Sequence, residues 1–134
     1  MIHCGVGIIL NTKAQVLLAQ RNADDSFGNY WEFPGGKQEI GESLDECVVR
    51  EVKEEADIHI QITAPFHELI NPYKDQEISL HFFLCQYMSG DPKPLESQKI
   101  QWTNMSSLKE YQFPPANEII IQKLLQHHSI HSRN

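Results

Sequence analysis

The chain has 134 residues, with 18 Asp and Glu against 11 Lys and Arg, for a formal net charge of −7. Hydrophobic residues make up 40% and charged residues 22%, values that are ordinary for a folded domain and argue against global disorder. The negative charge argues against binding to nucleic acid or an anionic membrane, because basic surfaces hold both. We expect a single domain over residues 1–134 and a monomer.

Cysteine usage and the first residues indicate the cellular setting. Cys4, Cys47 and Cys85 lie in apolar contexts, and three cysteines cannot all pair within one chain. They favour reduced, buried thiols, and none has the short spacing of a Cys/His metal site. The start, MIHCGVGIIL, lacks the charged region and apolar length of a signal peptide, and no stretch is long enough to span a bilayer. We therefore expect a soluble, cytoplasmic protein without a membrane partner.

The first third of the chain predicts strands joined by polar connections. Three apolar runs fit strands: Val6–Leu10, Val16–Gln20 and Trp31–Phe33. Asn11–Gln15 is typical of a turn, so the first two runs predict a β-hairpin. Asn22–Asn29 is polar and predicts a loop, and Pro34-Gly35-Gly36 is expected to end the third strand.

The next segment carries the clearest helix. Ser43 and Glu46 have the spacing of a capping box, which begins a helix. An apolar stripe follows at helical spacing, formed by Val48, Val52 and Ala56. The segment therefore predicts a helix that buries one face against the rest of the domain.

The remaining segments alternate between strands and loops before a last helix. Strands are predicted at Ile58–Ile62, at Ile78–Tyr87 as a central strand, and at Ile100–Trp102. Gly90–Pro94 predicts a loop, and Ile119–Leu125 predicts a closing amphipathic helix. Residues 127–134 are polar, and we expect a flexible tail. The order of elements indicates an α/β domain with a mixed sheet between helices.

Three glutamates on the predicted helix call for an explanation. Glu51, Glu54 and Glu55 stand at i, i+3 and i+4, so they share one face of the helix. Like charges at this spacing cost about 0.2–0.5 kcal/mol per pair, and a hard cation such as Mg²⁺ would offset that repulsion. A solvated acidic face is the alternative, and the three residues alone favour it.

The surrounding sequence changes that interpretation. Residues Gly36 to Ile58 resemble the Nudix box, G-x5-E-x7-R-E-U-x-E-E-x-G-U, where U is a bulky aliphatic residue. Every specified position matches except Asp57, where the pattern has glycine. That glycine follows the helix, where a left-handed conformation is often needed, and Asp tolerates it better than most residues. We expect a small loss of stability and intact chemistry.

The resemblance extends from Gly5 to about Leu125. Segments similar to the MutT-like branch of the Nudix family are Val6–Leu10, Arg21, Trp31–Lys37, Gly90–Trp102 and Phe113–Asn117. The resemblance implies an α/β/α sandwich and a Mg²⁺-dependent nucleoside triphosphate pyrophosphohydrolase, with Mn²⁺ as a possible substitute. The branch attacks the β-phosphorus, and its substrates include 8-oxo-dGTP and dGTP, which yield the monophosphate and pyrophosphate. Such an enzyme sanitises the nucleotide pool.

The resemblance also implies a role for each metal-site residue. Glu51, Glu54 and Glu55 are expected as metal ligands, together with the main-chain carbonyl of Gly35. Glu96 is expected as a further metal ligand or as the general base, and the sequence leaves this choice open.

Two further box residues are expected behind the ligands. Glu42 and Arg50 are implied to orient the ligand carboxylates. The resemblance therefore assigns catalysis to Arg50, Glu54 and Glu96.

Base recognition is expected from Asn117. A rigid turn with Asn as helix cap, worth about 1 kcal/mol, is the structural alternative for Phe113–Asn117. The resemblance instead implies that the Asn117 amide reads guanine, with Arg21 and Phe33 as further substrate contacts, although Phe33 also fits a core position. Gln76 stands where some relatives carry a basic group, so the sequence leaves open whether 8-oxoguanine is discriminated from guanine.

Two alternatives keep the same motif with another function. One is hydrolysis of CTP-like pyrimidine nucleotides or of a nucleoside diphosphate derivative. The other is a non-catalytic nucleotide sensor, which the retention of every box glutamate disfavours.

Overall fold

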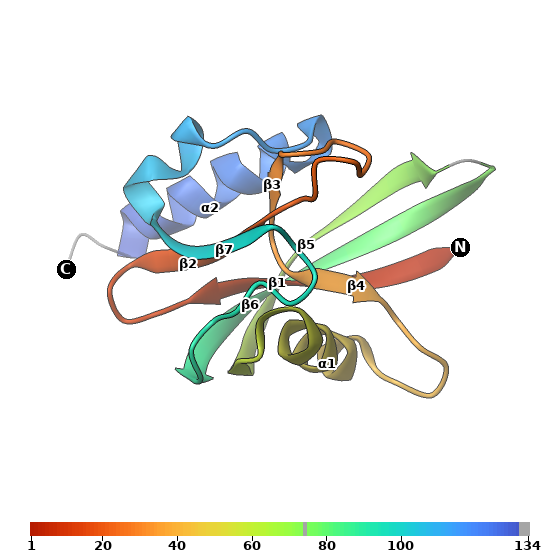
Figure 1. Cartoon of the computed structure of the whole chain (residues 1–134), viewed down its shortest axis with the longest axis horizontal. Coiled ribbons are helices and arrows are strands. Elements are labelled where there is room, and N and C mark those ends of the chain that lie inside the picture. The colour runs from red at the N-terminus through yellow and green to blue at the C-terminus, as the bar shows by residue number, and fades with distance from the viewer. Residues whose placement is uncertain (74, 132–134) are drawn as a thin grey trace.

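A mixed β-sheet carries a helix on each face in the computed structural model, which describes residues 1–73 and 75–131 (Figure 1). The strands are β1 (Ile2–Leu10), β2 (Gln15–Gln20), β3 (Trp31–Glu32), β4 (Gly35–Lys37), β5 (His59–Tyr73), β6 (Gln76–Ser89) and β7 (Lys99–Asn104). The helices are α1 (Leu44–Ala56) and α2 (Glu118–His131), with 3-10 turns η1 (Met105–Glu110) and η2 (Pro115–Asn117). The predicted α/β/α arrangement is confirmed.

Two strands, β2 and β4, share one edge of β1 in the sheet. Its strand order is β3-β2-β1-β6-β5, with β4 paired to β1 and β7 paired to β2. Strands β1 and β6 run parallel along their whole length, whereas the other pairs are antiparallel. The second edge of β1 is shared, because Cys4–Val6 pairs with β4 and Leu10 pairs with β2. The predicted hairpin and the central position of β6 are both confirmed.

The start and end of α1 follow the sequence signals. Ser43 and Glu46 form the predicted capping box, with each side chain accepting from the other residue's backbone N–H. Asp57 ends the helix in the left-handed region, with φ 58°, and its N–H donates to the Lys53 carbonyl at 3.0 Å. Asp57 also pairs with Lys53 and with Lys93, so the helix end is held by side chains as well.

Two hydrophobic clusters fix the helices on opposite faces of the sheet. The cluster under α1 contains Val48, Val52, Ala56, Ile9, Leu17, Ile58, Ile60, Phe83 and Cys85. The cluster under α2 and η1 contains Ile120, Ile121, Leu124, Met105, Leu108, Val6, Ile8, Val16, Leu18, Phe33 and Phe82. No helix in the described ranges is long and apolar enough to cross a membrane.

Two strand boundaries differ from the prediction. Gly35 and Gly36 were expected to end a strand, yet with Lys37 they form β4, because glycine permits close approach to β1. A Cβ on Gly35 would lie 2.4 Å from the Gly5 carbonyl oxygen. The strand expected at Ile58–Ile62 continues to Tyr73, since β5 follows β6 along the hairpin that projects from the sheet (Figure 1).

The flexible tail predicted for residues 127–134 is wrong over most of its length. Helix α2 continues to His131, and residues 132–134 lie outside the described part of the chain. Contacts with β5 explain the added turns. Lys123 donates to the Phe66 carbonyl and lies over its ring, while the His127 ring packs edge-on against the same ring.

Candidate active site

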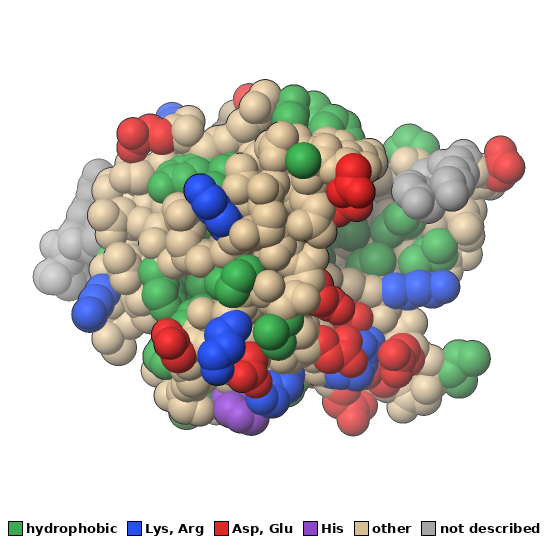
Figure 2. All heavy atoms as spheres, in the orientation of Figure 1, with side chains coloured by type: hydrophobic (Ala, Val, Ile, Leu, Met, Phe, Trp, Pro, Cys, Tyr) green, Lys and Arg blue, Asp and Glu red, His purple; other side chains and the backbone are tan. Residues whose placement is uncertain are grey.

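The glutamates of the box lie between α1 and β4. Glu51, with a side chain 15% exposed, packs over the backbone of Gly36, where a Cβ would fall 2.4 Å from the Glu51 Cδ. Glu54 is more open, with 48% of its side chain exposed. Acidic and basic side chains gather over α1, whereas the upper part of the same view is mostly uncharged (Figure 2). The densest group of charged side chains on this face therefore lies over α1.

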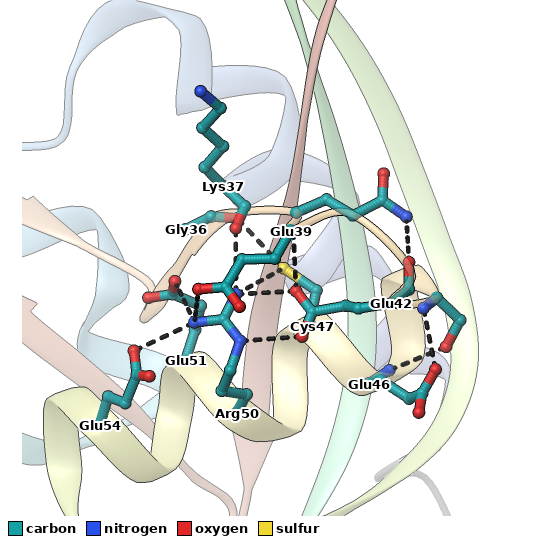
Figure 3. Close-up of polar contacts among 11 residues, drawn as sticks. Gly36, Lys37, Glu39, Glu42, Glu46, Cys47, Arg50, Glu51 and Glu54 are labelled. Atoms are coloured by element: carbon teal, nitrogen blue, oxygen red, sulfur yellow. Dashed lines mark hydrogen bonds and ion pairs between the residues drawn. The ribbon is translucent and has the colours of Figure 1, made fainter.

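Arg50 is the centre of this edge (Figure 3). Its Nε and Nη2 donate to the two carboxylate oxygens of Glu42, at 2.8 and 2.7 Å. Its Nη1 donates to Glu51 at 2.9 Å and to Glu54 at 3.1 Å. A bidentate guanidinium pair fixes direction as well as charge. Arg50 thus hydrogen-bonds two of the three expected metal ligands and is itself held by Glu42, whereas the orienting role expected of these two residues stays a prediction.

The ion pairs shift the protonation of both partners. Hydrogen bonds from Arg50, and next from the Glu39 N–H, lower the pKa of Glu42 to about 2. Hydrogen bonding to Glu42 raises the pKa of Arg50 above its ordinary value. Both groups therefore stay charged at neutral pH.

Glu55, like Glu51, is partly buried, whereas Glu54 is exposed. Its Oε2 accepts a hydrogen bond from the Gly35 N–H at 2.9 Å, which ties α1 to β4. Burial, and then the negative charges of Glu51 and Glu32, raise its pKa to about 9. Burial likewise raises the pKa of Glu51. Two carboxyl groups are thus held where a nearby positive charge would stabilise their anionic forms.

The chemistry of this donor set fits a hard divalent cation. Within residues 1–73 and 75–131, no three acidic, His or Cys side chains already form a complete ligand set, and Arg50 bonds two of the expected ligands. The charge of Glu96 nevertheless acts on both Glu51 and Glu55, so the Glu96 loop lies within electrostatic range of the box glutamates. A partly buried group of carboxylate oxygens is what Mg²⁺ or Mn²⁺ takes as ligands.

Glu96 reaches this edge from the connection between β6 and β7. The neighbouring Leu95 N–H donates to the Glu55 carbonyl at 3.1 Å, and the Lys93 N–H donates to the Ala56 carbonyl at 2.9 Å. These bonds hold the connection against the end of α1. The charge of Glu96 acts on Glu51 and Glu55 from this connection, and its role as metal ligand or general base stays a prediction.

Glu32 belongs to the same site and was missed in the sequence. It accepts a 2.6 Å ion pair from Arg21 and adds to the negative field at Glu55. Burial raises its pKa, and Arg21 opposes that shift. Strand alternation offered a signal, because Glu32 points away from the face shared by Trp31 and Phe33.

A cavity of about 540 Å³ connects this edge to the predicted base reader. Its acidic end includes Glu32, Gly35 and Gly36, and its far end includes Pro114–Asn117. Its wall also contains Val6, Phe33, Ile78, Leu80 and Phe82, with Cys4, Arg21, Ser26, Phe27, Asn71 and Pro72. The cavity is therefore charged at one end and mostly apolar at the other, which suits a nucleotide.

The predicted substrate contacts meet in this cavity. Phe33 is only 5% exposed and stacks on Phe113, so it is both a core residue and part of the wall. Asn117 closes η2, and no side-chain hydrogen bond of the described residues involves its amide. Gln76 lies at the end of the β5–β6 hairpin and does not line the cavity, whereas Ile78 does.

A second hollow of about 520 Å³ lies beside η1 and α2. Its wall includes Tyr111, Phe113 and Ile121 and none of the box residues. The first cavity, in contrast, includes Gly35 and Gly36 beside the box glutamates, and we therefore assign the active site to it.

Comparison with known proteins agrees with this architecture. The family model described as "NUDIX domain" matches residues 5–123. The 8-oxo-dGTP diphosphatase of Escherichia coli K12 is 39% identical over 123 residues, covering 92% of this chain and 95% of that protein. The CTP pyrophosphohydrolase of the same organism is 28% identical over 120 residues, covering 90% and 89%.

A solved structure with MutT in its description has a similar fold. It is described as MutT from Aliivibrio salmonicida and Vibrio cholerae, with 31% identity and a TM-score of 0.72 over 93% of this chain and 96% of that one. Sequence and fold comparisons therefore agree. The chain belongs to the Nudix family of hydrolases.

Proposed function

We propose that the protein hydrolyses a purine nucleoside triphosphate, with 8-oxo-dGTP as the leading substrate and dGTP as the parent compound, to the monophosphate and pyrophosphate. One observation carries the proposal: a single cavity extends from Gly35 and Gly36, whose backbone packs against the carboxylates of Glu55 and Glu51, to the turn that carries Asn117. Family members generally need a divalent metal and act on small nucleotides. The relative with 39% identity is named an 8-oxo-dGTP diphosphatase, which supports this substrate.

The base end of the cavity supports a purine. The Asn117 amide offers a donor and an acceptor, and it makes no other side-chain hydrogen bond among the described residues. The apolar wall formed by Phe33, Leu80 and Phe82 accommodates the flat ring. Arg21, fixed by Glu32, lies on the same wall and adds positive charge near the nucleotide.

The carboxylate end would hold Mg²⁺, for which Mn²⁺ can substitute. The ligands in this proposal are Glu51, Glu54, Glu55, Glu96 and the Gly35 carbonyl. When bound, the metal neutralises phosphate charge and polarises the attacked phosphate. Arg50, anchored on Glu42, keeps the ligand carboxylates aimed at one place.

The chain's own groups then direct the water. A carboxylate, Glu54 or Glu96, accepts a proton from water, and the water oxygen bonds to the β-phosphorus. The bond from that phosphorus to the α–β bridging oxygen breaks, so the nucleoside monophosphate leaves and pyrophosphate carries the water oxygen. The reaction consumes only the nucleotide and water and needs no other reactant.

The test is a nucleotide panel with every product identified. We would compare 8-oxo-dGTP, dGTP, CTP and ADP-ribose, with Mg²⁺, with Mn²⁺ and with chelator, and run the best substrate in ¹⁸O-water. We expect the highest kcat/KM with a purine triphosphate, release of pyrophosphate, and the label in pyrophosphate. Release of inorganic phosphate, or label in the monophosphate, would contradict the proposed reaction.

A pyrimidine substrate is the second candidate, because a relative with 28% identity is named a CTP pyrophosphohydrolase. The same panel separates the two candidates. A higher kcat/KM for CTP than for both purine nucleotides would identify CTP, and not a purine nucleotide, as the preferred substrate.

A further inference from the structure

A loop on the cavity wall and the loop that carries Glu96 meet where β2 ends and β7 begins. The base loop, residues 22–29, follows β2 and brings Ser26 and Phe27 to the cavity wall. The Glu96 loop, residues 90–98, precedes β7, whose first residue Lys99 pairs with Gln20 at the end of β2. The two loops therefore leave the sheet side by side.

The side chain of Gln98 joins these loops. Its Nε2 donates to the Arg21 carbonyl at 2.7 Å and to Asn29 Oδ1 at 2.6 Å, so both of its N–H groups are used. Its backbone N–H donates to the Gln20 carbonyl at 3.2 Å. Because a backbone carbonyl can only accept, the amide group must face the base loop in this orientation.

A second hydrogen bond connects the base loop directly to the main chain of Glu96. Asn22 Nδ2 donates to the main-chain carbonyl of Glu96 at 3.2 Å. Asn29 stands in the left-handed region, with φ 67°, and its N–H donates to the Arg21 carbonyl at 3.1 Å. The backbone around Glu96 is thus bonded to both ends of the base loop.

The base loop forms part of the cavity wall and contains a residue with an unfavourable backbone conformation. Phe27 is half exposed on the cavity wall and has φ 52°, a conformation that is an outlier for a bulky residue. Arg21 Nε donates to the Ser26 carbonyl at 2.7 Å while its Nη1 holds Glu32. A nucleotide in the cavity therefore touches a loop whose other contacts lead to Glu96.

We propose that Gln98 is a positioning residue that, with Asn22, couples the base loop to the placement of Glu96. A substrate that fixes the conformation of the base loop also fixes the position of the Glu96 main chain, because the hydrogen bonds from Gln98 and Asn22 connect the two. This inference rests on the proposed function in one respect, the participation of Glu96 in hydrolysis. It adds a reason why a correct base would raise turnover in addition to binding.

The first test compares Gln98, which directly precedes β7, with Gln101 inside β7. Gln98→Ala removes the bonds between the loops, whereas Gln101→Ala removes a similar pair, to Thr103 and Tyr111, away from both loops. We expect Gln98→Ala to lower kcat for the best purine triphosphate about tenfold, with KM changed less than about threefold. Gln101→Ala should leave kcat within about twofold of the parent.

A double variant asks whether Gln98 acts through Glu96. If it does, Glu96→Gln combined with Gln98→Ala has the same kcat as Glu96→Gln alone, within about twofold. Losses that multiply would overturn the inference. An unchanged kcat in Glu96→Gln alone would instead contradict the proposed role of Glu96.

Hydrogen exchange tests the coupling without any assay of activity. In Gln98→Ala we expect faster amide exchange in both the base loop and the Glu96 loop. Faster exchange in residues 90–98 alone would show that the loops are independent and would overturn the inference, whatever the kinetics of Glu96→Gln.

Discussion

The two ends of the cavity are built in opposite ways. Most of the carboxylate end comes from one continuous stretch, Gly36–Ile58, in which a single helix presents three glutamates and Arg50 bonds two of them. Only Glu32, Gly35 and Glu96 join this end from outside the stretch. The base end comes from distant segments, including β1, β6 and η2, and its wall is mostly uncharged. Chemistry is thus local in the sequence, whereas substrate choice is distributed over the fold. Substitutions at the first end should affect all nucleotides alike, and those at the second should discriminate among them.

The largest effect is expected from Glu55→Gln. The amide keeps the volume of the buried side chain and removes its negative charge, so kcat/KM should fall about 10²–10⁴-fold for every nucleotide. Steady-state kinetics with several substrates measures this. Glu46→Gln, on the same helix, retains a capping-box residue and should have no effect on kcat/KM. A loss confined to one base would break the distinction between the two ends.

Arg50→Lys should have the next largest effect, lowering kcat/KM about 10–100-fold. One ammonium group cannot bridge both oxygens of Glu42 while also bonding Glu51. Kinetics at several Mg²⁺ concentrations should show a weaker response to the metal. Lys53→Arg, exposed on the same helix, serves as the control. An unchanged metal response would show that Arg50 does not align the ligands.

Asn117→Ala should alter preference more than rate. Loss of two hydrogen bonds to the base should cost about 1–3 kcal/mol of discrimination, whereas kcat/KM for a poor substrate should hardly change. The ratio of kcat/KM values between a purine and CTP measures the effect. An equal loss for both nucleotides would indicate that Asn117 supports the turn and does not read the base.

The smallest effect is expected at Asp57, the residue that departs from the box pattern. Asp57→Gly removes the left-handed conformational cost but also the pairs with Lys53 and Lys93, so the melting temperature should stay within a few degrees of the parent. Asp57→Ala loses the pairs and keeps the cost, so it should melt lower than both. Activity of the folded variants should be equal. An Ala variant as stable as the Gly variant would contradict this account of the helix end.

The sequence predicted α1 and its charged face because the determinants are local. The capping box, the apolar period and the glutamate spacing all lie within one helix. The strand β4 was not predicted, because two glycines usually indicate a turn and only pairing with β1 reveals the strand. Glu32 was missed because its burial depends on Arg21, which lies 11 positions earlier in the chain.

The base end of the cavity was harder still to predict from the sequence. Asn117 was proposed from its motif, but a cap and a base reader have the same local sequence. Only the fold places its amide on the cavity wall that contains Phe33 and Ile78. The position of Gln76 away from that wall depends on the length of the β5–β6 hairpin, which the sequence pattern did not predict.

Two glycines of the box set different limits on sequence variation. At Gly36 the space of a side chain is already filled by the Glu51 carboxylate, so a saturation library selected for activity should return glycine alone. At Gly41 there is open space, and only φ +84° restricts the choice, so asparagine and aspartate should survive there. The first glycine is required by the chemistry of its neighbour, and the second only by the path of the chain.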